Sequence, residues 1–462
     1  MKAMVIAGTQ SGAGKTTITL GILAALIRQG RTVVSFKVGP DFIDPGHHER
    51  ITGRVCRNLD GWMLTKAYNH TLFRQAARDA DIVVVEGVMG LFDGYDGRSE
   101  AGSTAEMAKW LDLSVILAVN AKSMARSAAA LVQGFERFDP GLNFAGVIFN
   151  NLGSRRHLAY LQDALADKVH MPCLGGIQRD KVIEIPERHL GLVTREDHPL
   201  ADPFIGRLAD IIEADVDLSG LVHSLPEYGP PVPSPTESAP PAKPKVRIGV
   251  ARDKAFCFYY RDNLDLLASA GAELVPFSPT NDTSLPEELD GLYFGGGYPE
   301  VYARQLSENE NMRKQVHHCC RNRMPIYGEC GGFMYLSDGI TTLDGEIHPM
   351  TGCFHLRTKM SPRLTALGYR EITLRAQTPL GLPGTVIRGH EFHYSTLDTV
   401  SDSLPSVYQI TDRAGVEKPA GGFCTRQTLG SYIHLHFGSC PNTARHFTGL
   451  CRDYYRKRKQ HL

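Results

Sequence analysis

The sequence lacks several features that would assign a protein to a broad class at once. No segment is long and apolar enough to span a membrane, and the first residues run from an apolar strand into a glycine-rich loop instead of a charged and then apolar signal peptide. The 50 lysine and arginine residues balance the 50 aspartate and glutamate residues. This balance gives no reason to expect a nucleic-acid partner or an acidic membrane surface. We therefore expect neither partner.

The cysteines lack the spacing that would define a structural framework. Ten are present and no CxxC pair repeats among them, which argues against a zinc site and against a disulfide-rich fold. They lie at positions 56, 173, 257, 319, 320, 330, 353, 424, 440 and 451. Reduced thiols are the simpler interpretation, and they indicate a cytoplasmic protein.

The length of the chain predicts more than one domain, and a proline-rich stretch marks a boundary. The 462 residues exceed what one ordinary hydrophobic core holds. Residues 226–245 are crowded with proline, serine and glutamate and offer few core-forming side chains. We expect an N-terminal domain over residues 1–225, a linker over 226–245 and a C-terminal domain over 246–462.

A phosphate-binding loop is predicted close to the N-terminus. An apolar strand over residues 3–7 leads into GTQSGAGKTT and then into an amphipathic helix, which is the context that a P-loop needs. Backbone N–H groups of such a loop point at phosphate oxygens, while Lys15 adds a positive charge and Thr16 a hydroxyl for Mg²⁺. The first glycine lies one residue earlier than in GxxxxGK[ST], a spacing similar to that of dethiobiotin-synthetase-like P-loop proteins. The expected ATP ligands are Gly12, Gly14, Lys15, Thr16 and Thr17.

Two carboxylates follow the second predicted strand, residues 32–36. Asp41 and Asp44 lie three residues apart in the segment KVGPDFIDPG, at the carboxyl edge where a parallel sheet binds its ligands. They could hold Mg²⁺ or position a substrate, or they could cap a turn beside proline and glycine. We favour the ligand-binding role because the loop belongs to a phosphate-binding domain.

Further polar side chains end the next strands. Residues 82–85 are apolar and lead into Glu86, a Walker-B-like carboxylate that could complete Mg²⁺ coordination with Thr16. Asp93 lies in the following loop, and Asn150 ends a later strand. Asn150 suits either recognition of an adenine edge or a turn.

The alternation of strands and helices predicts the fold class. Each N-terminal strand is apolar along its length, which is typical of a doubly wound, mostly parallel sheet in an α/β domain. The C-terminal domain begins in the same way, with strands over 246–251, 272–275 and 290–294. Residues 345–425 then turn to a β pattern. We expect two α/β domains.

A cysteine between glycines is the strongest feature of the C-terminal domain. Residues 324–327 form a short strand, and Cys330 follows in GECGGFMYL, where a helical pattern begins. A side chain on such a strand-to-helix turn is exposed like the nucleophile of an elbow. The Gly331 N–H could stabilise an oxyanion, and the helix N-terminus could favour the thiolate. The alternative is a structural cysteine buried at a glycine-rich turn.

A triple glycine, residues 295–297, follows a buried strand in the segment FGGGYPE. Glycine permits close backbone approach, so the Gly297 N–H could supply the second half of an oxyanion hole. The alternative is a flexible turn.

Two histidine-containing strands are predicted near the C-terminal end. In GHEFHY, His390 and Glu391 face opposite sides of a strand, which suits a wall of an active site or an interdomain role better than a metal site. In GSYIHLHF, residues 430–437, His434 and His436 stand at i and i+2 and therefore share a face. We expect His434 to be a base for Cys330 and His436 to orient it.

Taken together, these segments resemble the cobyrinate a,c-diamide synthase family of glutamine-dependent amidotransferases in corrinoid biosynthesis. The resemblance spans nearly the whole chain, and its segments occur in the family's order: GTQSGAGKTT, KVGPDFIDPG, VVVEGVMGLFDG, the proline-rich break, FGGGYPE, YGECGGFMYL, GHEFHYS and GSYIHLHF. It implies a P-loop synthetase domain followed by a class I-like glutamine amidotransferase α/β domain.

The resemblance implies roles for individual residues. Cys330 would attack the glutamine amide and His434 would activate the thiol. His436 stands where ordinary class I enzymes carry glutamate, so its orienting role is a departure from their pattern. Lys37 matches a lysine near the reacting carboxylate of dethiobiotin-synthetase-like relatives. The Mg²⁺ ligands would be Thr16, Glu86 and Asp41, and the residues lining the carboxylate-activating site would be Asp41, Ile43, Asp44, Glu86 and Asp93.

The implied reaction uses ATP, Mg²⁺ and L-glutamine to form two amides on a corrinoid or related tetrapyrrole through acyl phosphates. The chain would act as a monomer or a homodimer. Rival substrates within the class are nickel-sirohydrochlorin and hydrogenobyrinic acid. A rival from another class is a MinD-like regulatory ATPase with a degenerate glutaminase domain, against which an intact Cys330 and His434 argue.

Overall fold

A computed structural model describes residues 1–183, 187–188, 191–192, 200–229, 246–400 and 404–460. The chain divides into two compact units, unit 1 (Met1–Pro235) and unit 2 (Thr236–Leu462). Most of the predicted linker, residues 230–245, lies outside the described residues. Its first part packs on unit 1, because Glu227 bridges to Lys2 and the Tyr228 N–H donates to the Met1 carbonyl at 2.8 Å.

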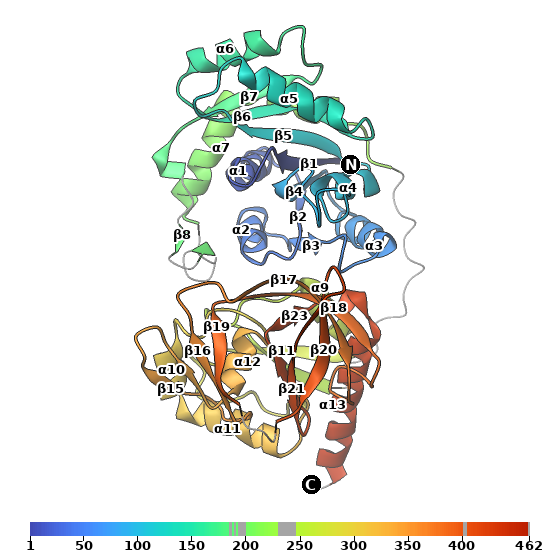
Figure 1. Ribbon diagram of the computed structural model, residues 1–462, viewed down its shortest axis with the longest axis vertical. Coiled ribbons are helices and arrows are strands. Elements are labelled where there is room, and N and C mark those ends of the chain that lie inside the picture. The colour runs from blue at the N-terminus through green and yellow to red at the C-terminus, as the bar shows by residue number, and fades with distance from the viewer. Residues whose placement is uncertain (184–186, 189–190, 193–199, 230–245, 401–403, 461–462) are drawn as a thin grey trace. The chain divides into compact units, whose positions relative to one another are not determined.

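Unit 1 is built on a seven-stranded, fully parallel sheet (Figure 1), with strand order β3-β2-β4-β1-β5-β6-β7. The strands are β1 (Lys2–Gly8), β2 (Val33–Val38), β3 (Arg57–Leu59), β4 (Ile82–Gly90), β5 (Ser114–Asn120), β6 (Asn143–Leu152) and β7 (Cys173–Gln178), with a separate hairpin of β8 (Glu187–Arg188) and β9 (Gly191–Leu192). The predicted doubly wound parallel sheet is confirmed.

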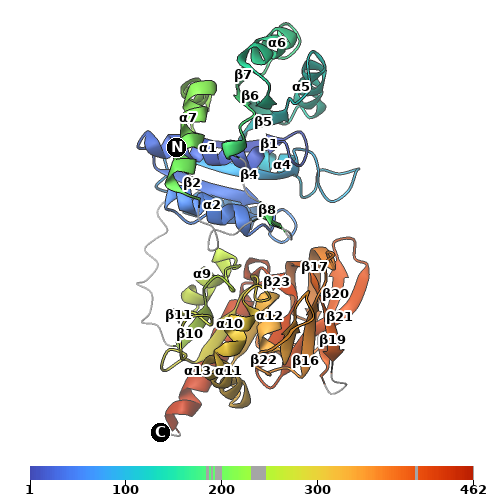
Figure 2. The same ribbon diagram turned by 90° about the vertical axis from the view of Figure 1, so that its left-hand side faces the viewer.

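Helices cover both faces of this sheet. They are α1 (Lys15–Arg28), α2 (Ile43–Thr52), α3 (Lys66–Ala76), α4 (Thr104–Trp110), α5 (Ser127–Phe138), α6 (Arg155–Leu165), the 3-10 turn η1 (Lys181–Ile183), α7 (Asp202–Asp215) and α8 (Leu218–Ser224). On one face Met4 and Ile6 pack with α1, α7 and α8. On the other face Val5 and Ala7 pack with α3, α4, α5 and α6, so that α7 and α5 lie on opposite sides of the sheet in Figure 2. This alternation explains why each strand is apolar along its length.

Unit 2 carries a ten-stranded mixed sheet with strand order β11-β10-β12-β13-β22-β21-β20-β17-β18-β23. Its first five strands in this order are parallel, and the remaining pairs are antiparallel. The strands are β10 (Val246–Ala251), β11 (Ala272–Phe277), β12 (Gly291–Phe294), β13 (Ile326–Glu329), β17 (Ala366–Leu374), β18 (Val386–His393), β20 (Ser406–Asp412), β21 (Glu417–Thr425), β22 (Thr428–Ser431) and β23 (Ile433–Leu435).

A second, four-stranded sheet and several helices complete unit 2. The sheet holds β15 (Ile347–Pro349), β14 (Gly339–Thr341), β16 (Leu356–Met360) and β19 (Ser395–Val400) in that spatial order. The helices are α9 (Arg261–Ser269), α10 (Ala303–Glu308), α11 (Glu310–Arg321), α12 (Gly331–Leu336) and α13 (Asn442–Gln460), with a 3-10 turn η2 (Phe437–Ser439). The predicted β-rich half of an α/β domain is confirmed.

One predicted strand is wrong. Residues 430–437 do not form a single strand, because the chain leaves β13 after Ser431 and joins β18 at Ile433. The Ser431 hydroxyl accepts the Ile433 N–H at 3.2 Å and fixes this change of partner. His434 is therefore a strand residue on β23, whereas His436 precedes η2.

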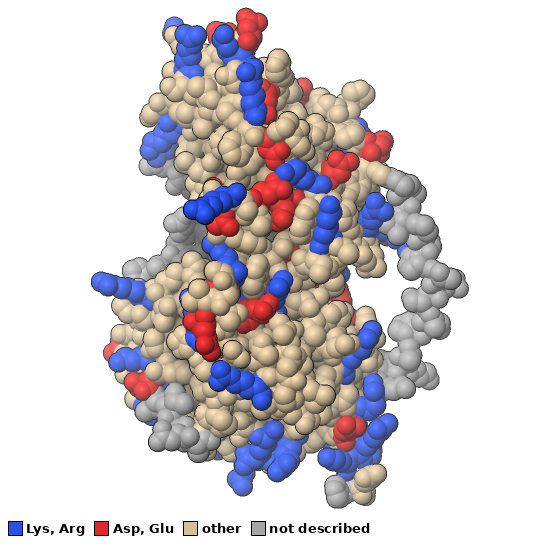
Figure 3. All heavy atoms as spheres, turned by 45° about the vertical axis from the view of Figure 1, so that its right-hand side comes forward, with Lys and Arg blue, Asp and Glu red and all other residues tan. Residues whose placement is uncertain are grey.

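The surface carries charges of both signs. On the face seen in Figure 3, both units intersperse acidic and basic side chains. Among the described residues, no helix combines the length and apolarity that a membrane crossing requires.

Candidate active sites

The P-loop of unit 1 has the geometry of a phosphate cradle. It joins β1 to α1, and Gly14 caps the helix with a φ of 94°. A side chain at Gly14 would be strained at this φ, and its Cβ would lie 1.9 Å from the Asn150 amide nitrogen. The Lys15 ammonium folds back onto the loop and donates to the carbonyls of Gln10 and Met89. Burial, and then the charge of Lys37, lower the pKa of Lys15.

Glu86 is the centre of a buried polar network beside this loop. Its Oε1 accepts from the Thr16 hydroxyl at 2.6 Å and from the Lys37 ammonium at 2.8 Å. Its Oε2 lies 2.7 Å from His48 Nε2, and His48 Nδ1 lies 3.4 Å from the Cys56 thiol. Lys37 and Glu86 meet because they are register partners on the neighbouring strands β2 and β4.

Opposite charges compensate for the burial of this network. Burial opposes the charged forms of Lys37 and Glu86, yet the charges of Asp44 and then of Glu86 raise the pKa of Lys37, and Lys37 followed by His48 lowers the pKa of Glu86. Asp44 joins them, with Oδ2 at 2.7 Å from Lys37 Nζ. Its own pKa is raised by burial and by the neighbouring charges of Asp41 and Glu86. The pair of Lys37 and Glu86 is therefore charged before any ligand binds.

The other predicted ligands of unit 1 lie around the same edge of the sheet. Asp41 Oδ1 accepts the Ile43 N–H at 2.7 Å, so this carboxylate caps the start of α2. Asp93 is exposed, and its Oδ2 accepts the Gly90 N–H at 2.8 Å. The structure thus brings Thr16, Lys37 and Glu86 into direct contact and gives Asp41 and Asp93 local backbone partners.

Asn150 contacts the P-loop itself. Its side-chain amide donates to the Ala13 carbonyl at 3.2 Å, and its Oδ1 accepts the Asn151 N–H at 2.9 Å. These bonds hold the end of β6 against the loop. They use one donor and one acceptor of the side chain.

Cys330 occupies a strained turn between β13 and α12. Its φ of 47° and ψ of −103° are unusual for a residue with a side chain, and such strain is typical of a nucleophile elbow. The Cys330 N–H donates to the Ser431 carbonyl at 2.8 Å, and the thiol lies 3.9 Å from the Phe392 carbonyl. Strands β22 and β18 therefore flank the nucleophile.

The thiol of Cys330 is not activated in this state. Burial, and then the charge of Glu300, raise its pKa well above the usual range, although a contact with the Gly331 N–H opposes the rise. That the helix N-terminus favours the thiolate stays a prediction, because burial is the largest influence on this pKa. The helix has only six residues, and burial outweighs its effect. A base must take the proton when the substrate is present.

The two predicted oxyanion-hole residues are neighbours in space. A Cβ placed on Gly331 would lie 3.1 Å from the Gly297 nitrogen, and one placed on Gly297 would lie 2.1 Å from the Ala255 carbonyl. Only residues without side chains allow this close approach. The Gly332 N–H, which donates to the Gly295 carbonyl at 2.9 Å, fastens the two segments together.

His434 lies at the same place, on β23. It is the register partner of His390 on β18, and the two rings stack with centroids 4.8 Å apart. A Cβ on Gly296 would meet the His434 ring at 2.2 Å, so this ring packs on the triple glycine that also borders Gly331. His390 is held by the Tyr260 hydroxyl, which lies 2.6 Å from its Nδ1. His390 therefore lies beside His434, and its role as a wall of an active site stays a prediction.

His436 is set in different surroundings. Its Nδ1 accepts the Gly438 N–H at 3.1 Å, and its Nε2 lies 3.8 Å from Asp262 Oδ2. Burial lowers the pKa of His436 to about 3, which keeps the ring neutral. The carboxylate within ion-pair distance of His434 is that of Glu329, whose Oε2 lies 3.8 Å from His434 Nδ1.

Sequence reasoning missed Glu329, His48 and Cys56. A carboxylate directly before the cysteine, at the end of an apolar strand, is a signal that could have singled out Glu329, because acidic residues are seldom fully buried without a partner. His48 and Cys56 carry no such signal, because their contacts depend on how α2 packs against β4.

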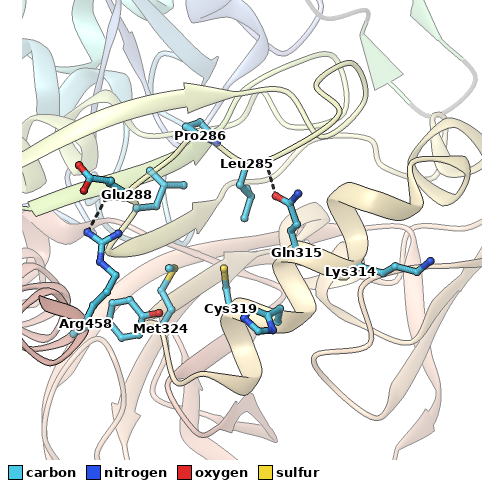
Figure 4. Close-up of a pocket in the computed structure, with 11 residues that line it drawn as sticks. Leu285, Pro286, Glu288, Lys314, Gln315, Cys319, Met324 and Arg458 are labelled. Atoms are coloured by element: carbon cyan, nitrogen blue, oxygen red, sulfur yellow. Dashed lines mark hydrogen bonds between the residues drawn. The ribbon is translucent and has the colours of Figure 1, made fainter. Parts of the chain in front are cut away.

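Possible metal ligands and one cavity were also located. In the described part of the chain no three His, Cys, Asp or Glu side chains form a metal-holding group. The hydroxyl of Thr16 and the carboxylate of Glu86 are nevertheless oxygen ligands of the kind that Mg²⁺ prefers. A cavity of about 410 Å³ in unit 2, shown in Figure 4, lies between α11, α13 and the segment 285–289, and neither Cys330 nor His434 lines it.

Comparisons with known proteins agree with the two-unit architecture. Residues 4–193 match the CobQ/CobB/MinD/ParA nucleotide binding domain, and residues 247–441 match the CobB/CobQ-like glutamine amidotransferase domain. Three relatives carry the name cobyrinate a,c-diamide synthase. The protein of Syntrophotalea carbinolica is 48% identical over 97% of this chain and 98% of its own length. That of Dehalococcoides mccartyi strain CBDB1 is 42% identical over 98% of both chains, and that of Priestia megaterium is 38% identical over 99% of both.

Proposed function

The chain belongs to the cobyrinate a,c-diamide synthase family, and from this we propose that it uses ATP and the amide nitrogen of glutamine to convert the a and c carboxylates of cobyrinic acid to amides. The observation that supports the proposal is that one chain carries both sets of groups. Unit 1 has a P-loop beside the hydrogen-bonded pair of Thr16 and Glu86, and unit 2 has His434 packed on Gly296, in the glycine segment that also borders the Cys330 elbow.

Unit 2 would release ammonia from glutamine. His434 takes the proton of the Cys330 thiol, and the sulfur attacks the amide carbon of glutamine. The N–H groups of Gly331 and Gly297 stabilise the oxyanion. The tetrahedral adduct expels ammonia, which receives the proton from His434 and leaves a thioester. Water then hydrolyses the thioester to glutamate and restores the thiol.

Unit 1 would activate the acceptor. A carboxylate does not exchange its oxygen for ammonia unaided, so the γ-phosphoryl group of ATP is transferred to it and ADP leaves. Ammonia attacks the acyl phosphate, and inorganic phosphate departs. Gly12, Gly14, Lys15 and Thr17 would hold the ATP phosphates. The Lys37 ammonium, which lies beside Glu86 and Asp44, would favour the phosphoryl transfer by compensating the negative charge of the phosphate.

The acceptor would bind at the same edge of the sheet. Asp41, Ile43, Asp44 and Asp93 would line its site, and Asn150 would face the nucleotide. Thr16, Glu86 and Asp41 would hold Mg²⁺. The ion would compensate the negative charge of the ATP phosphates. The hydrogen bond between Thr16 and Glu86 keeps both oxygens in place for this purpose. The ten free cysteines support a cytoplasmic location.

Turnover of three acceptors side by side tests the proposal. Cobyrinic acid, hydrogenobyrinic acid and nickel-sirohydrochlorin are each supplied with ATP, Mg²⁺ and glutamine, and amide formation is followed by mass spectrometry. We expect two amides on cobyrinic acid. Two amides only on another acceptor would reassign the substrate, and amides on none would contradict the proposal.

A regulatory ATPase is the rival from another class. Such a protein has no use for a glutaminase, so a Cys330→Ala variant would behave as the wild type in every assay. A loss of glutamate release in this variant excludes the rival.

A further inference from the structure

We propose that Glu329 is the positioning residue of His434, taking the place that a carboxylate two residues after the histidine holds in ordinary class I enzymes. This inference rests on the proposed glutaminase function of unit 2. It assigns Glu329 a role that acts through His434, since the Glu329 carboxylate lies within ion-pair distance of the His434 ring.

The first support is the way in which Glu329 is held. It is the last residue of β13 and is completely buried. Its Oε1 accepts from the Tyr327 hydroxyl at 2.7 Å and from the Leu435 N–H at 3.3 Å. These two donors hold the carboxyl group in place. One of them, the Leu435 N–H, belongs to the residue directly after His434 and therefore ties the carboxyl group to the strand that carries the histidine.

The second support is the direction of the remaining oxygen. With Oε1 occupied, Oε2 lies 3.8 Å from His434 Nδ1. This is an ion-pair distance and longer than a hydrogen bond. Catalytic hydrogen bonds are often long in the unliganded state and shorten when charge develops. Nδ1 thus faces the carboxylate, and the proposal assigns transfer of the thiol proton to Nε2.

The third support is the electrostatic setting. Tyr293 and Tyr327 also face the carboxylate, and burial followed by the charge of Glu329 raises the pKa of both phenols, which keeps them neutral. His390, stacked on His434, has its pKa lowered by burial and by the nearby histidines. In the proposal His434 takes the thiol proton, and the buried Glu329 carboxylate 3.8 Å from its Nδ1 would stabilise the positive charge that then forms on the ring.

His436 does not fit this role as well. Its Nδ1 accepts a backbone N–H, so its proton lies on Nε2 and faces Asp262. A neutral ring directed at another carboxylate gives little stabilisation to an imidazolium at His434. The two residues thus lie in separate pairs: His434 with Glu329, and His436 with Asp262.

A double-mutant cycle in the full-length protein tests the assignment. Glutamate release is measured with ATP, Mg²⁺ and cobyrinic acid present, for the wild type, Glu329→Gln, His434→Ala and the double variant. Gln keeps the acceptor oxygen for Tyr327 and Leu435 and removes the charge. We expect Glu329→Gln to lower kcat by roughly 10² to 10⁴-fold with KM changed less than about threefold, and to have no further effect in the His434→Ala background.

Tyr327→Phe is the matched control, because it removes a hydrogen bond from Glu329 and leaves the charge. We expect its kcat to stay within about fivefold of the wild type, in line with one lost neutral hydrogen bond. Thermal unfolding shows whether each variant is folded. If Glu329→Gln does not fold, Glu329→Asp replaces it in the same cycle. The aspartate side chain is one methylene group shorter, so its carboxylate would lie farther from His434.

Two results would overturn the inference: a Glu329 variant with wild-type kcat, or an equal loss in both the wild-type and the His434→Ala backgrounds, which marks a structural role. Failure of the proposed function is distinguishable, because the wild type itself would then release no glutamate.

Discussion

In unit 1 the Lys37 ammonium lies 2.7 Å from Asp44 and 2.8 Å from Glu86, whereas in unit 2 the Cys330 thiol is surrounded by apolar groups and anions. Burial has opposite consequences in the two places. In unit 1 it strengthens an ion pair that exists without a ligand. In unit 2 burial raises the pKa of the Cys330 thiol and so disfavours the thiolate, which the proposed glutaminase reaction requires. Unit 1 is therefore organised for charge in advance, whereas the proposed reaction of unit 2 forms charge by moving a proton to His434.

This comparison explains why the two sites use different devices. A phosphate site needs fixed donors and cations, and a rigid loop with paired side chains provides them. A thiol that remained an anion would react without substrate. Under the proposed function, the raised pKa of Cys330 would keep the thiol protonated until glutamine binds.

The largest effect that would separate the two sites is expected from Cys330→Ala. Glutamine-dependent amide formation should fall by at least about 10³-fold, because no other group forms the thioester. Amide formation with added ammonium salt should persist, since unit 1 is unchanged. Cys319→Ala, a cysteine that lines the cavity of Figure 4, is the control and should be as active as the wild type. Equal loss with glutamine and with ammonia would show that the two sites are not separable.

Removal of the Lys37 cation from unit 1 should lower stability as well as amide formation. Lys37→Met leaves Asp44 buried without its cation and leaves Glu86 with His48 and Thr16 alone, and we expect a loss of about 3–5 kcal/mol in the unfolding free energy of unit 1. Denaturant unfolding measures this loss. The unfolding transition of unit 1 is recognised as the one that moves to higher denaturant concentration when ATP is added. Lys109→Met is the control: its side chain, paired with Asp139, is 26% exposed. The loss there should be below about 1 kcal/mol. Equal losses would contradict a charged pair formed in advance.

The raised pKa of Cys330 predicts slow alkylation in the absence of glutamine. At pH 8 a thiol with a raised pKa holds a smaller thiolate fraction than an unfolded chain, so its rate with iodoacetamide should be at least about tenfold lower. The rate should still increase with pH beyond the point at which the unfolded thiol levels off. Mass spectrometry of the Cys330 peptide, native against urea-unfolded, follows both. A native rate equal to the unfolded rate would mean that the thiolate is formed in advance.

The smallest effect is expected at the contact between β6 and the P-loop. Asn150→Ala removes the hydrogen bond to the Ala13 carbonyl, which is worth about 1 kcal/mol. KM for ATP should increase about fivefold while kcat is retained. Asn143→Ala, at the other end of β6, is the control and should leave KM unchanged. A loss of more than about 100-fold in the first variant would assign Asn150 a part in the chemistry.

The sequence alone predicted the parts of each site that are contiguous in the chain. The P-loop and the Cys330 elbow each combine a strand, glycines and a helix within a few residues, so local geometry decides them. Glu86 was also predictable, because a carboxylate at the end of an apolar strand is conspicuous.

Contacts between distant segments were not predictable in this way. Glu329 meets His434 because β13 pairs with β22, which places Glu329 opposite Ser431, three residues before His434, and His48 meets Glu86 because α2 packs beside β4. The break at Ser431 was missed because residues 430–437 keep an apolar alternation and contain no proline or internal glycine. A change of strand partner depends on tertiary packing, which alternation does not reveal.

Transfer of labelled nitrogen tests the central claim, that ammonia made at Cys330 is used for amide formation driven by ATP. The wild type is supplied with cobyrinic acid, ATP, Mg²⁺ and glutamine labelled with ¹⁵N in its amide, and the product is analysed by mass spectrometry. The account predicts a diamide that carries ¹⁵N in both new amides, and none when ATP is omitted. A product with unlabelled amides, or glutamate release without any amide formation, would contradict it.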